Sequence, residues 1–138
     1  MQIIIRNSFL DEKIILLTVD NFNLIVMESN EMWLVVFVDS TNSLSHHISI
    51  KSEWDQSAKE LRGKVNMGKV YSKDLALQFD VKSFPTIMYF PQGDKSDHSS
   101  YEIYEGEVTA NGIVTWALKR LNVKLIPSPL PKNIGKYS

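Results

Sequence analysis

Apolar residues occur along the chain in short runs, and the first two runs are typical of buried strands. Residues 13–18 (KIILLT) and 32–38 (MWLVVFV) are rich in β-branched and aromatic side chains, which suit a sheet covered on both faces. Between the runs, Asp20 precedes a short segment with Phe22 and Val26 on one helical face, so we expect Asp20 to cap a helix there. The pattern therefore predicts strand, helix and strand in this order.

Helical spacing follows the second strand. Apolar side chains at steps of three and four predict a helix from residue 47 or 48 to Leu61, and Arg62-Gly63 ends it. Residues 65–71 predict a third strand with a less regular alternation. Another helix begins at Ser72. Its expected inward face comprises Leu75, Ala76 and Phe79.

The last elements are a hairpin and a helix. Residues 86–90 (TIMYF) predict a strand, 91–94 (PQGD) a turn, and 101–104 a strand that pairs with the first one. Thr109 is positioned to cap the final helix. The apolar stripe of that helix comprises Ile113, Trp116, Ala117 and Leu121.

This order of elements predicts an α/β fold with a central mixed β-sheet flanked by helices, because crossover helices join the early strands and a hairpin joins the last two. We expect one domain over residues 13–122, after an N-terminal extension over residues 1–12. Residues 123–138 are expected to form a tail, in which prolines at every second position from 127 to 131 disfavour a helix.

Composition excludes several classes of partner and cofactor. The net charge is −1 and no long basic run occurs, so nucleic acid is not an expected partner. The apolar runs are far shorter than the ~20 residues that span a bilayer, and no membrane insertion is predicted. The N-terminus also lacks the pattern of a secretory signal. The chain has no cysteine, which excludes disulfide bonds, thiolate nucleophiles and cysteine-ligated metals, and we predict no cofactor.

Several short segments carry a resemblance to a known family. The longest is residues 79–87 (FDVKSFPTI), and others in the expected order are Trp33-Leu34-Val35, Glu53-Trp54 and Tyr104-Glu105-Gly106. Over residues 14–121 the chain is similar to a thioredoxin domain of the protein disulfide isomerase family, and it looks nearest to the second such domain of P5-like isomerases. The resemblance implies a thioredoxin fold and, for the protein, a place in the lumen of the endoplasmic reticulum.

The resemblance also implies a peptide-binding loop around Pro85. In this family the matching proline is cis, and the backbone of the residue before it pairs with extended substrate peptide. We therefore expect a cis Phe84–Pro85 bond and a groove formed by Ser83, Phe84 and Pro85, with Leu44 as an apolar contact from the neighbouring loop. From the residues alone, Pro85 could simply start a strand.

Active members of the family carry Cys-Gly-His-Cys between the second strand and the next helix. Counting forward from Trp33 and backward from Trp54 gives positions for the first cysteine that differ by two residues, so this loop is two residues longer and has no thiols. Thiol–disulfide exchange requires an attacking thiolate, and we predict no catalytic residue. Val36 matches the position of the buried acid of active members. The degenerate active-site loop comprises Asn42, Ser43, Leu44, Ser45, His46 and His47.

Other chemistry at this loop has weaker support. His46, His47 and Asp39 suggest a metal site, but adjacent histidines on a helix point about 100° apart, and we predict no metal. A hydrolase triad of Ser45, His47 and Asp39 would still need an oxyanion hole. Ser43 or Ser45 is better suited to capping the first turn of the helix.

We therefore predict a redox-inactive domain that binds a polypeptide client or a partner protein without thiol–disulfide exchange, and that is not an enzyme. The alternative is a purely structural or assembly domain with a closed groove, in which Trp116 and the proline-containing tail make the contacts. A third hypothesis, a different enzyme on the same fold such as a glutathione-dependent peroxidase, lacks the cysteine or additional helical domain that it requires.

Overall fold

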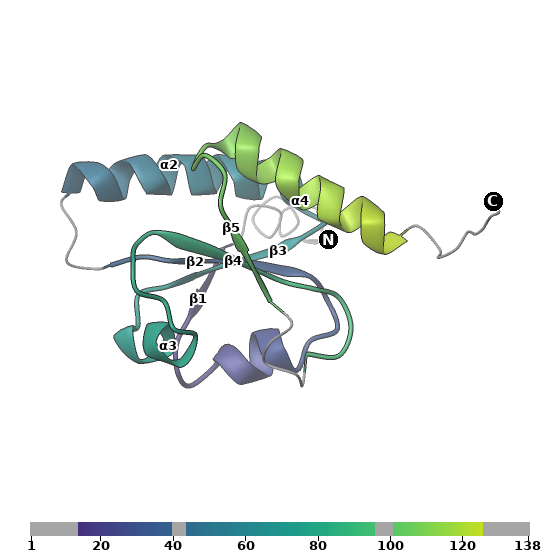
Figure 1. Ribbon diagram of the computed structural model, residues 1–138, viewed down its shortest axis with the longest axis horizontal. Coiled ribbons are helices and arrows are strands. Elements are labelled where there is room, and N and C mark those ends of the chain that lie inside the picture. The colour runs from purple at the N-terminus through teal and green to yellow at the C-terminus, as the bar shows by residue number, and fades with distance from the viewer. Residues whose placement is uncertain (1–13, 40–43, 96–100, 126–138) are drawn as a thin grey trace, which may run out of the picture.

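The computed structural model describes residues 14–39, 44–95 and 101–125; side chains are not described for residues 44–49 and 122–125. Within these residues, five strands form one sheet in the order β1-β3-β2-β4-β5 (Figure 1). The expected extension over residues 1–12 and most of the expected tail lie outside the described residues. The strands are β1 (Ile15–Leu17), β2 (Trp33–Phe37), β3 (Asn66–Val70), β4 (Thr86–Phe90) and β5 (Glu102–Tyr104).

The sheet is mixed, as the order of elements predicts. β1, β3 and β2 run parallel, whereas β4 is antiparallel to β2 and β5 is antiparallel to β4. The β4–β5 pair confirms the predicted hairpin. Helices α2 (Leu44–Leu61) and α4 (Ala110–Leu125) lie over one face of the sheet, and η1 (Asn23–Met27) and α3 (Lys73–Gln78) lie over the other (Figure 1).

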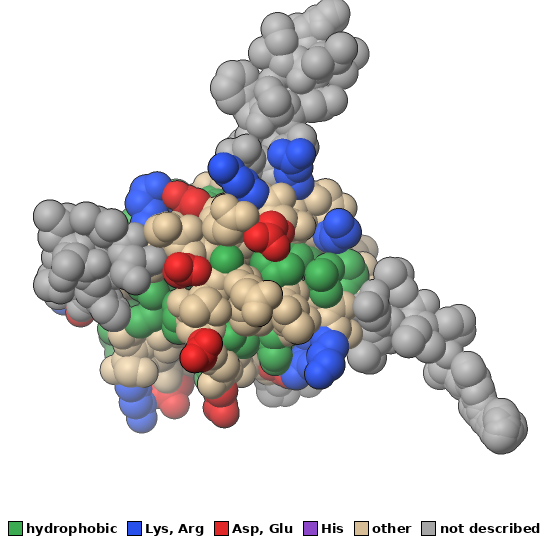
Figure 2. Space-filling view, turned by 90° about the horizontal axis from the view of Figure 1, so that it is seen from above, with side chains coloured by type: hydrophobic (Ala, Val, Ile, Leu, Met, Phe, Trp, Pro, Cys, Tyr) green, Lys and Arg blue, Asp and Glu red, His purple; other side chains and the backbone are tan. Residues whose placement is uncertain are grey.

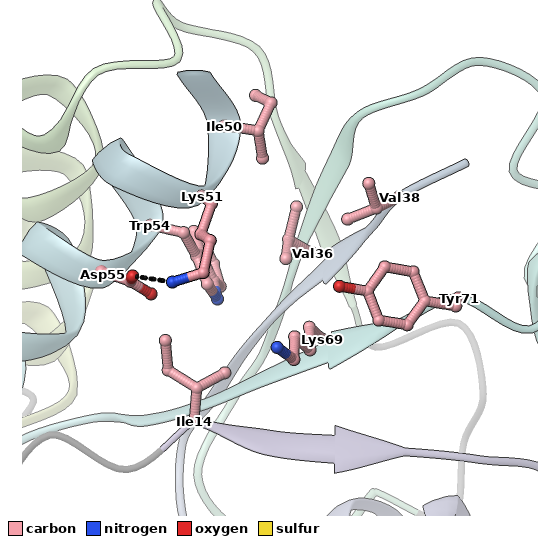
Figure 3. A pocket seen from close by; sticks show the side chains of 9 residues that line it. All are labelled: Ile14, Val36, Val38, Ile50, Lys51, Trp54, Asp55, Lys69 and Tyr71. Atoms are coloured by element: carbon pink, nitrogen blue, oxygen red, sulfur yellow. Dashed lines mark hydrogen bonds and ion pairs between the residues drawn. The ribbon is translucent and has the colours of Figure 1, made fainter. Parts of the chain in front are cut away.

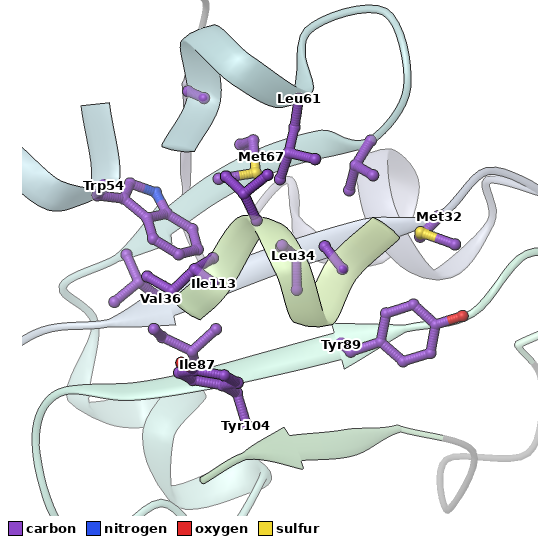
Figure 4. Close-up of a cluster of buried hydrophobic side chains, with 14 of the residues drawn as sticks. Met32, Leu34, Val36, Trp54, Leu61, Met67, Ile87, Tyr89, Tyr104 and Ile113 are labelled. Carbon is purple, nitrogen blue, oxygen red and sulfur yellow. The ribbon is translucent and has the colours of Figure 1, made fainter. Parts of the chain in front are cut away.

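Central strand β2 separates two apolar cores, because its side chains alternate between the faces. Leu34 and Val36 belong to the core beneath α2 and α4. Figure 4 shows Trp54 and Ile113 from these helices close to the β2 side chains. All five β2 residues are buried, so this strand is covered on both sides, as its continuous apolar sequence predicts.

The second core, beneath η1 and α3, is largely aromatic. The rings of Phe22 and Phe79 lie 5.2 Å apart, and Phe79 meets Phe90 edge to face at 5.6 Å. The Tyr101 ring also belongs to this cluster, with its centroid 5.7 Å from that of the Phe79 ring. Such tilted and edge-to-face pairs add about 0.5–1.5 kcal/mol each beyond the burial of apolar surface, so this cluster fixes the short helix η1 on the sheet.

Three predictions about where helices begin or end are confirmed. The Ser72 hydroxyl accepts a hydrogen bond from Leu75 N at 3.2 Å and caps α3. Thr109 Oγ1 accepts one from Gly112 N at 3.1 Å at the start of α4. Gly63, two residues after the end of α2, has φ +77°, a conformation that glycine adopts without steric cost.

Two expectations about helix ends were wrong. Asp20 does not cap η1: the residue before this π-helical turn is Phe22, without a side-chain cap, and Thr18 N instead donates to Asn21 Oδ1 at 2.8 Å. α2 begins at Leu44, about one turn earlier than predicted, since its polar first turn gives no apolar periodicity. α4 continues to Leu125, three residues beyond the expected domain end.

The outer face formed by α2 and α4 carries charges of both signs. Figure 2 shows acidic and basic side chains interspersed over this face, with apolar side chains between them. Two ion pairs belong to it: Lys51–Asp55 within α2 at 2.6 Å, and Arg120–Glu102 between α4 and β5 at 2.8 Å. Arg120 also lies over the Trp116 ring at 4.3 Å from its centroid.

Candidate functional site

The two segments that the sequence indicates as a site meet at one edge of the sheet. β2 and β4 are antiparallel, and Phe37 at the end of β2 pairs with Thr86 at the start of β4. Pro85 directly precedes Thr86, while β2 leads through Val38 and Asp39 toward α2. The Pro85 loop and the β2–α2 junction are therefore neighbours.

The degenerate active-site loop is described only in part. Asn42 and Ser43 lie outside the described residues. The backbone of residues 44–47 forms the first turn of α2, and the side chains of Leu44, Ser45, His46 and His47 are not among those described. Ser45 lies inside the helix rather than before it, so only Ser43 has the sequence position of an N-cap. The contact expected between Leu44 and a peptide stays a prediction.

Ser83, Phe84 and Pro85 form the loop that leads into β4. Ser83 is exposed, whereas Phe84 and Pro85 are half-buried, and the Phe84–Pro85 peptide bond is cis. The Phe84 ring packs against the aromatic core beneath η1 and α3. Thr86 Oγ1 donates a hydrogen bond to the Ser83 carbonyl at 2.7 Å, so the loop is held to the first residue of β4.

The preceding turn anchors this loop on its other side. Asp80 has φ +58° and reverses the chain after α3. Val81 is buried, and its N–H donates to the Ala76 carbonyl at 2.8 Å. Lys82 is exposed beside this anchor. The loop is thus fixed at Val81 and at Thr86, with the residues between them at the surface or half-buried.

The backbone N–H and C=O of Phe84 lie in the loop that leads into β4. Among residues 14–39, 44–95 and 101–125, no hydrogen bond involves the N–H or the C=O of Phe84. Backbone groups of native proteins nearly always have a partner, either in the protein or in water. Phe84 can therefore offer one donor and one acceptor to an added extended chain.

Beneath the β2–α2 junction, Val36 is buried at 1% exposure, in the position that the resemblance assigns to a buried acid. It lines a cavity of about 20 Å³ between α2 and β3 (Figure 3), which is room for about one water molecule. The other apolar residues that line the cavity are Ile14, Val38, Ile50 and Trp54.

Polar groups surround this cavity on two elements. Lys51 and Asp55 come from α2, and Lys69 and Tyr71 from β3 and its end. The hydrogen bond to Asp55 raises the pKa of Lys51, so Lys51 is charged at neutral pH. The indole N–H of Trp54 is buried and has no hydrogen-bond partner in the described part of the chain. An unpartnered buried donor costs about 1–3 kcal/mol.

Sequence reasoning missed two buried or inward-facing lysines. Lys69 stands two positions after the apolar Met67, and side chains two positions apart in a strand lie on the same face. The sequence of residues 65–71 therefore indicated that Lys69 faces inward. Lys95 follows a polar turn and gave no such signal, yet it is 1% exposed. Its Nζ donates to the carbonyls of Ser29 and, at 2.7 Å, Glu31. Burial lowers the pKa of Lys95.

The described residues hold no cluster of three or more histidine, cysteine, aspartate or glutamate side chains suited to a metal ion. Within the same residues, no helix has the length and apolar content needed to cross a membrane. Trp116, the contact considered for a structural domain, is half-buried against the core and meets Tyr104 at 5.5 Å and Tyr89 at 5.6 Å.

Comparison with known proteins agrees with this fold. Residues 13–119 match the thioredoxin family. The chain is 36% identical over 121 residues to a protein disulfide-isomerase A6 homologue of Drosophila melanogaster, with 86% of this chain and 27% of the relative covered. It is 33% identical over 130 residues to protein disulfide-isomerase A6 of Homo sapiens, with 92% and 28% covered.

A solved structure gives the same fold. The J-Trx1 fragment of ERdj5 superposes with a TM-score of 0.70 at 24% identity, with 85% of this chain and 54% of the fragment covered. The chain spans about a quarter of the length of the two disulfide isomerases. It belongs to the thioredoxin family, as a thioredoxin-fold domain related to protein disulfide isomerases that has no cysteine.

Proposed function

We propose that this domain binds extended polypeptide at the Phe84–Pro85 loop without thiol–disulfide exchange. The observation that carries the proposal is the backbone of Phe84, which finds no hydrogen-bond partner among the described residues and lies at the end of the sheet where β2 ends and β4 begins. An extended peptide gains affinity from such main-chain pairs, and side-chain pockets give specificity.

The absence of thiols limits what the site can do to a bound peptide. Exchange proceeds through a mixed disulfide, which needs a cysteine in the protein, and the chain has none. Binding without covalent chemistry is the function that remains for the loop. Because the relatives are named protein disulfide isomerases, we propose misfolded or unfolded chains as clients and the lumen of the endoplasmic reticulum as the compartment.

A titration of the ¹⁵N-labelled chain with a cysteine-free peptide of alternating apolar and polar residues tests the proposal. We expect saturable shifts of the amide signals of Ser83, Phe84 and Thr86. The same peptide N-methylated at alternate amides is the matched control, since it keeps its side chains and loses its backbone donors. Binding of both peptides with equal affinity would exclude backbone pairing.

Two variants separate the loop from general surface effects. Phe84→Ala removes the half-buried ring and should weaken peptide binding about tenfold, or about 1.4 kcal/mol. Lys82→Ala changes an exposed neighbour and should bind as the wild type does. If no peptide shifts the Phe84 region, the structural domain with a closed groove is the correct reading.

A further inference from the structure

The cavity between α2 and β3 lies on the other face of the sheet from the Phe84 ring. Val36 and Trp54, which line it, belong to the core beneath α2 and α4, whereas Phe84 packs on the core beneath η1 and α3. A ligand in this cavity would therefore be separate from a peptide at the Phe84 loop, and the inference below does not rest on the proposed function.

We propose that this cavity is a binding site for a carboxylate group. The first observation is the Trp54 side chain, which is 3% exposed and whose indole N–H has no partner in the described part of the chain. Figure 3 shows its ring nitrogen on the side of the ring that faces the cavity. This group can only donate a hydrogen bond, so the missing partner is an acceptor.

The second observation is the charge of Lys69. In the β2–β3 register Lys69 lies opposite Val36, and its amine points into the space between β3 and α2 (Figure 3). Within residues 14–39, 44–95 and 101–125 it forms no ion pair, and its Nζ lies 5.8 Å from the centroid of the Tyr71 ring. A lysine beside apolar residues favours an anion as its neighbour.

The third observation is that Asp55, the one carboxylate among the described residues that line the cavity, already has a partner. Asp55 Oδ2 accepts from Lys51 Nζ at 2.6 Å, so Lys51 and Asp55 balance each other and Lys69 leaves an excess of one positive charge. A cation would be repelled, and a neutral donor would not satisfy Trp54. A negatively charged acceptor fits both groups.

The size and the lining of the cavity further restrict the class of ligand that it can bind. The cavity of about 20 Å³ has room for about one water-sized group, so it admits one carboxylate oxygen of a ligand and excludes a folded segment. Its lining includes the apolar side chains of Val36, Val38 and Ile50, which suit the aliphatic part of such a ligand. Two sources share this chemistry: a small organic acid, or an aspartate or glutamate side chain of a bound polypeptide.

The test follows the indole signal of Trp54 in the full ¹⁵N-labelled chain, assigned by its loss in Trp54→Phe. Acetate is the first probe, and acetamide at the same ionic strength, set with chloride, is the matched neutral control. We expect acetate to shift the Trp54 signal saturably, with no comparable change at Trp33 or Trp116. An equal shift with acetamide or chloride would overturn the proposal, and so would the absence of a shift with every carboxylate probe.

Variants then assign the charge to Lys69. Lys69→Met keeps the aliphatic stem and should weaken acetate binding at least about tenfold, as expected for loss of a charge-assisted hydrogen bond. Lys59→Met, an exposed residue on the same helix as Trp54, should leave it unchanged. Equal effects of the two variants would show a general charge effect and contradict the site.

A second pair of probes distinguishes the two sources of the carboxylate. Glutamate blocked at both ends presents only its side chain, and blocked glutamine is its neutral match. Binding of blocked glutamate tighter than acetate assigns the site to polypeptide, and binding of acetate alone assigns it to small acids. Failure of every carboxylate overturns the site, while the peptide titration at Phe84 stands or falls independently.

Discussion

The side chain of Glu53 on α2 accepts a hydrogen bond from the backbone N–H of Ala110, the first residue of α4, with Oε1 and N 2.6 Å apart. The N-terminal amides of a helix have no partner within the helix, and Thr109 satisfies only that of Gly112. Glu53 thus completes the cap from another element and fixes α4 against α2 over the sheet.

We expect Glu53→Ala to lower the free energy of unfolding by about 1–2 kcal/mol, because it leaves the Ala110 amide without its charged acceptor. Glu53→Gln retains an acceptor oxygen and should lose less. Glu60→Ala removes an exposed glutamate from the same helix and should change stability by at most about 0.5 kcal/mol. Urea unfolding followed by circular dichroism measures all three, and equal losses for Glu53→Ala and Glu60→Ala would contradict a tertiary cap.

Lys95 ties the turn after β4 to the segment before β2. Its amine donates to the Ser29 and Glu31 carbonyls, and Gly93 N donates to the Asn30 carbonyl at 2.8 Å. Lys95→Met keeps the buried stem but leaves two carbonyls without this donor. We expect a loss of about 1–3 kcal/mol in the free energy of unfolding, measured by urea unfolding, with Lys64→Met, an exposed lysine, as the control.

The pKa of Lys95 predicts a pH dependence with a definite sign. Burial lowers this pKa below the ordinary value of 10.5, so between the lowered value and about pH 10.4 the unfolded chain binds more protons than the folded one. The stability of the wild type relative to Lys95→Met should therefore rise as the pH increases through this window. A constant or falling difference would show that the amine is not desolvated in the folded chain.

Two tyrosines predict the opposite trend at higher pH. Burial raises the pKa of Tyr89 and of Tyr104 above 10.0, so the folded chain keeps protons that the unfolded chain releases. This contribution to stability is fully present below about pH 10 and is lost as the pH rises through the raised values. Absorbance at 295 nm should therefore show Tyr89 and Tyr104 ionising at a higher pH in the folded chain than in the unfolded chain. Ionisation of these two tyrosines at the same pH in both states would contradict the burial.

Local signals in the sequence predicted the elements well, and contacts between distant residues account for what was missed. The caps by Ser72 and Thr109 join residues three positions apart, so their chemistry is visible in a short stretch. The Asp20 cap was predicted from the same kind of signal and was wrong, because the side chain of Asn21 accepts the hydrogen bond from Thr18 N in this turn.

The contacts of Glu53 and Lys95 span 57 and about 65 positions, and no local pattern indicates them. The candidate site likewise has one part that the sequence indicates and one part that depends on contacts between distant residues. The end of β2 and the start of β4, which lead to the candidate site, are neighbours through strand pairing, whereas peptide binding at the Phe84–Pro85 loop stays a prediction. The cavity at Trp54 depends on which side chains of two separate elements face each other, so only Lys69 gave any hint of it.

Hydrogen exchange at the Phe84 amide tests the central claim most directly. The full chain is exchanged in D₂O with and without a saturating concentration of the cysteine-free peptide, and the Phe84 signal is followed by NMR. If the peptide pairs with this backbone, exchange at Phe84 should slow at least about tenfold, while exposed Lys82 keeps its rate. An unchanged rate at Phe84 in the presence of bound peptide would contradict polypeptide binding at this loop.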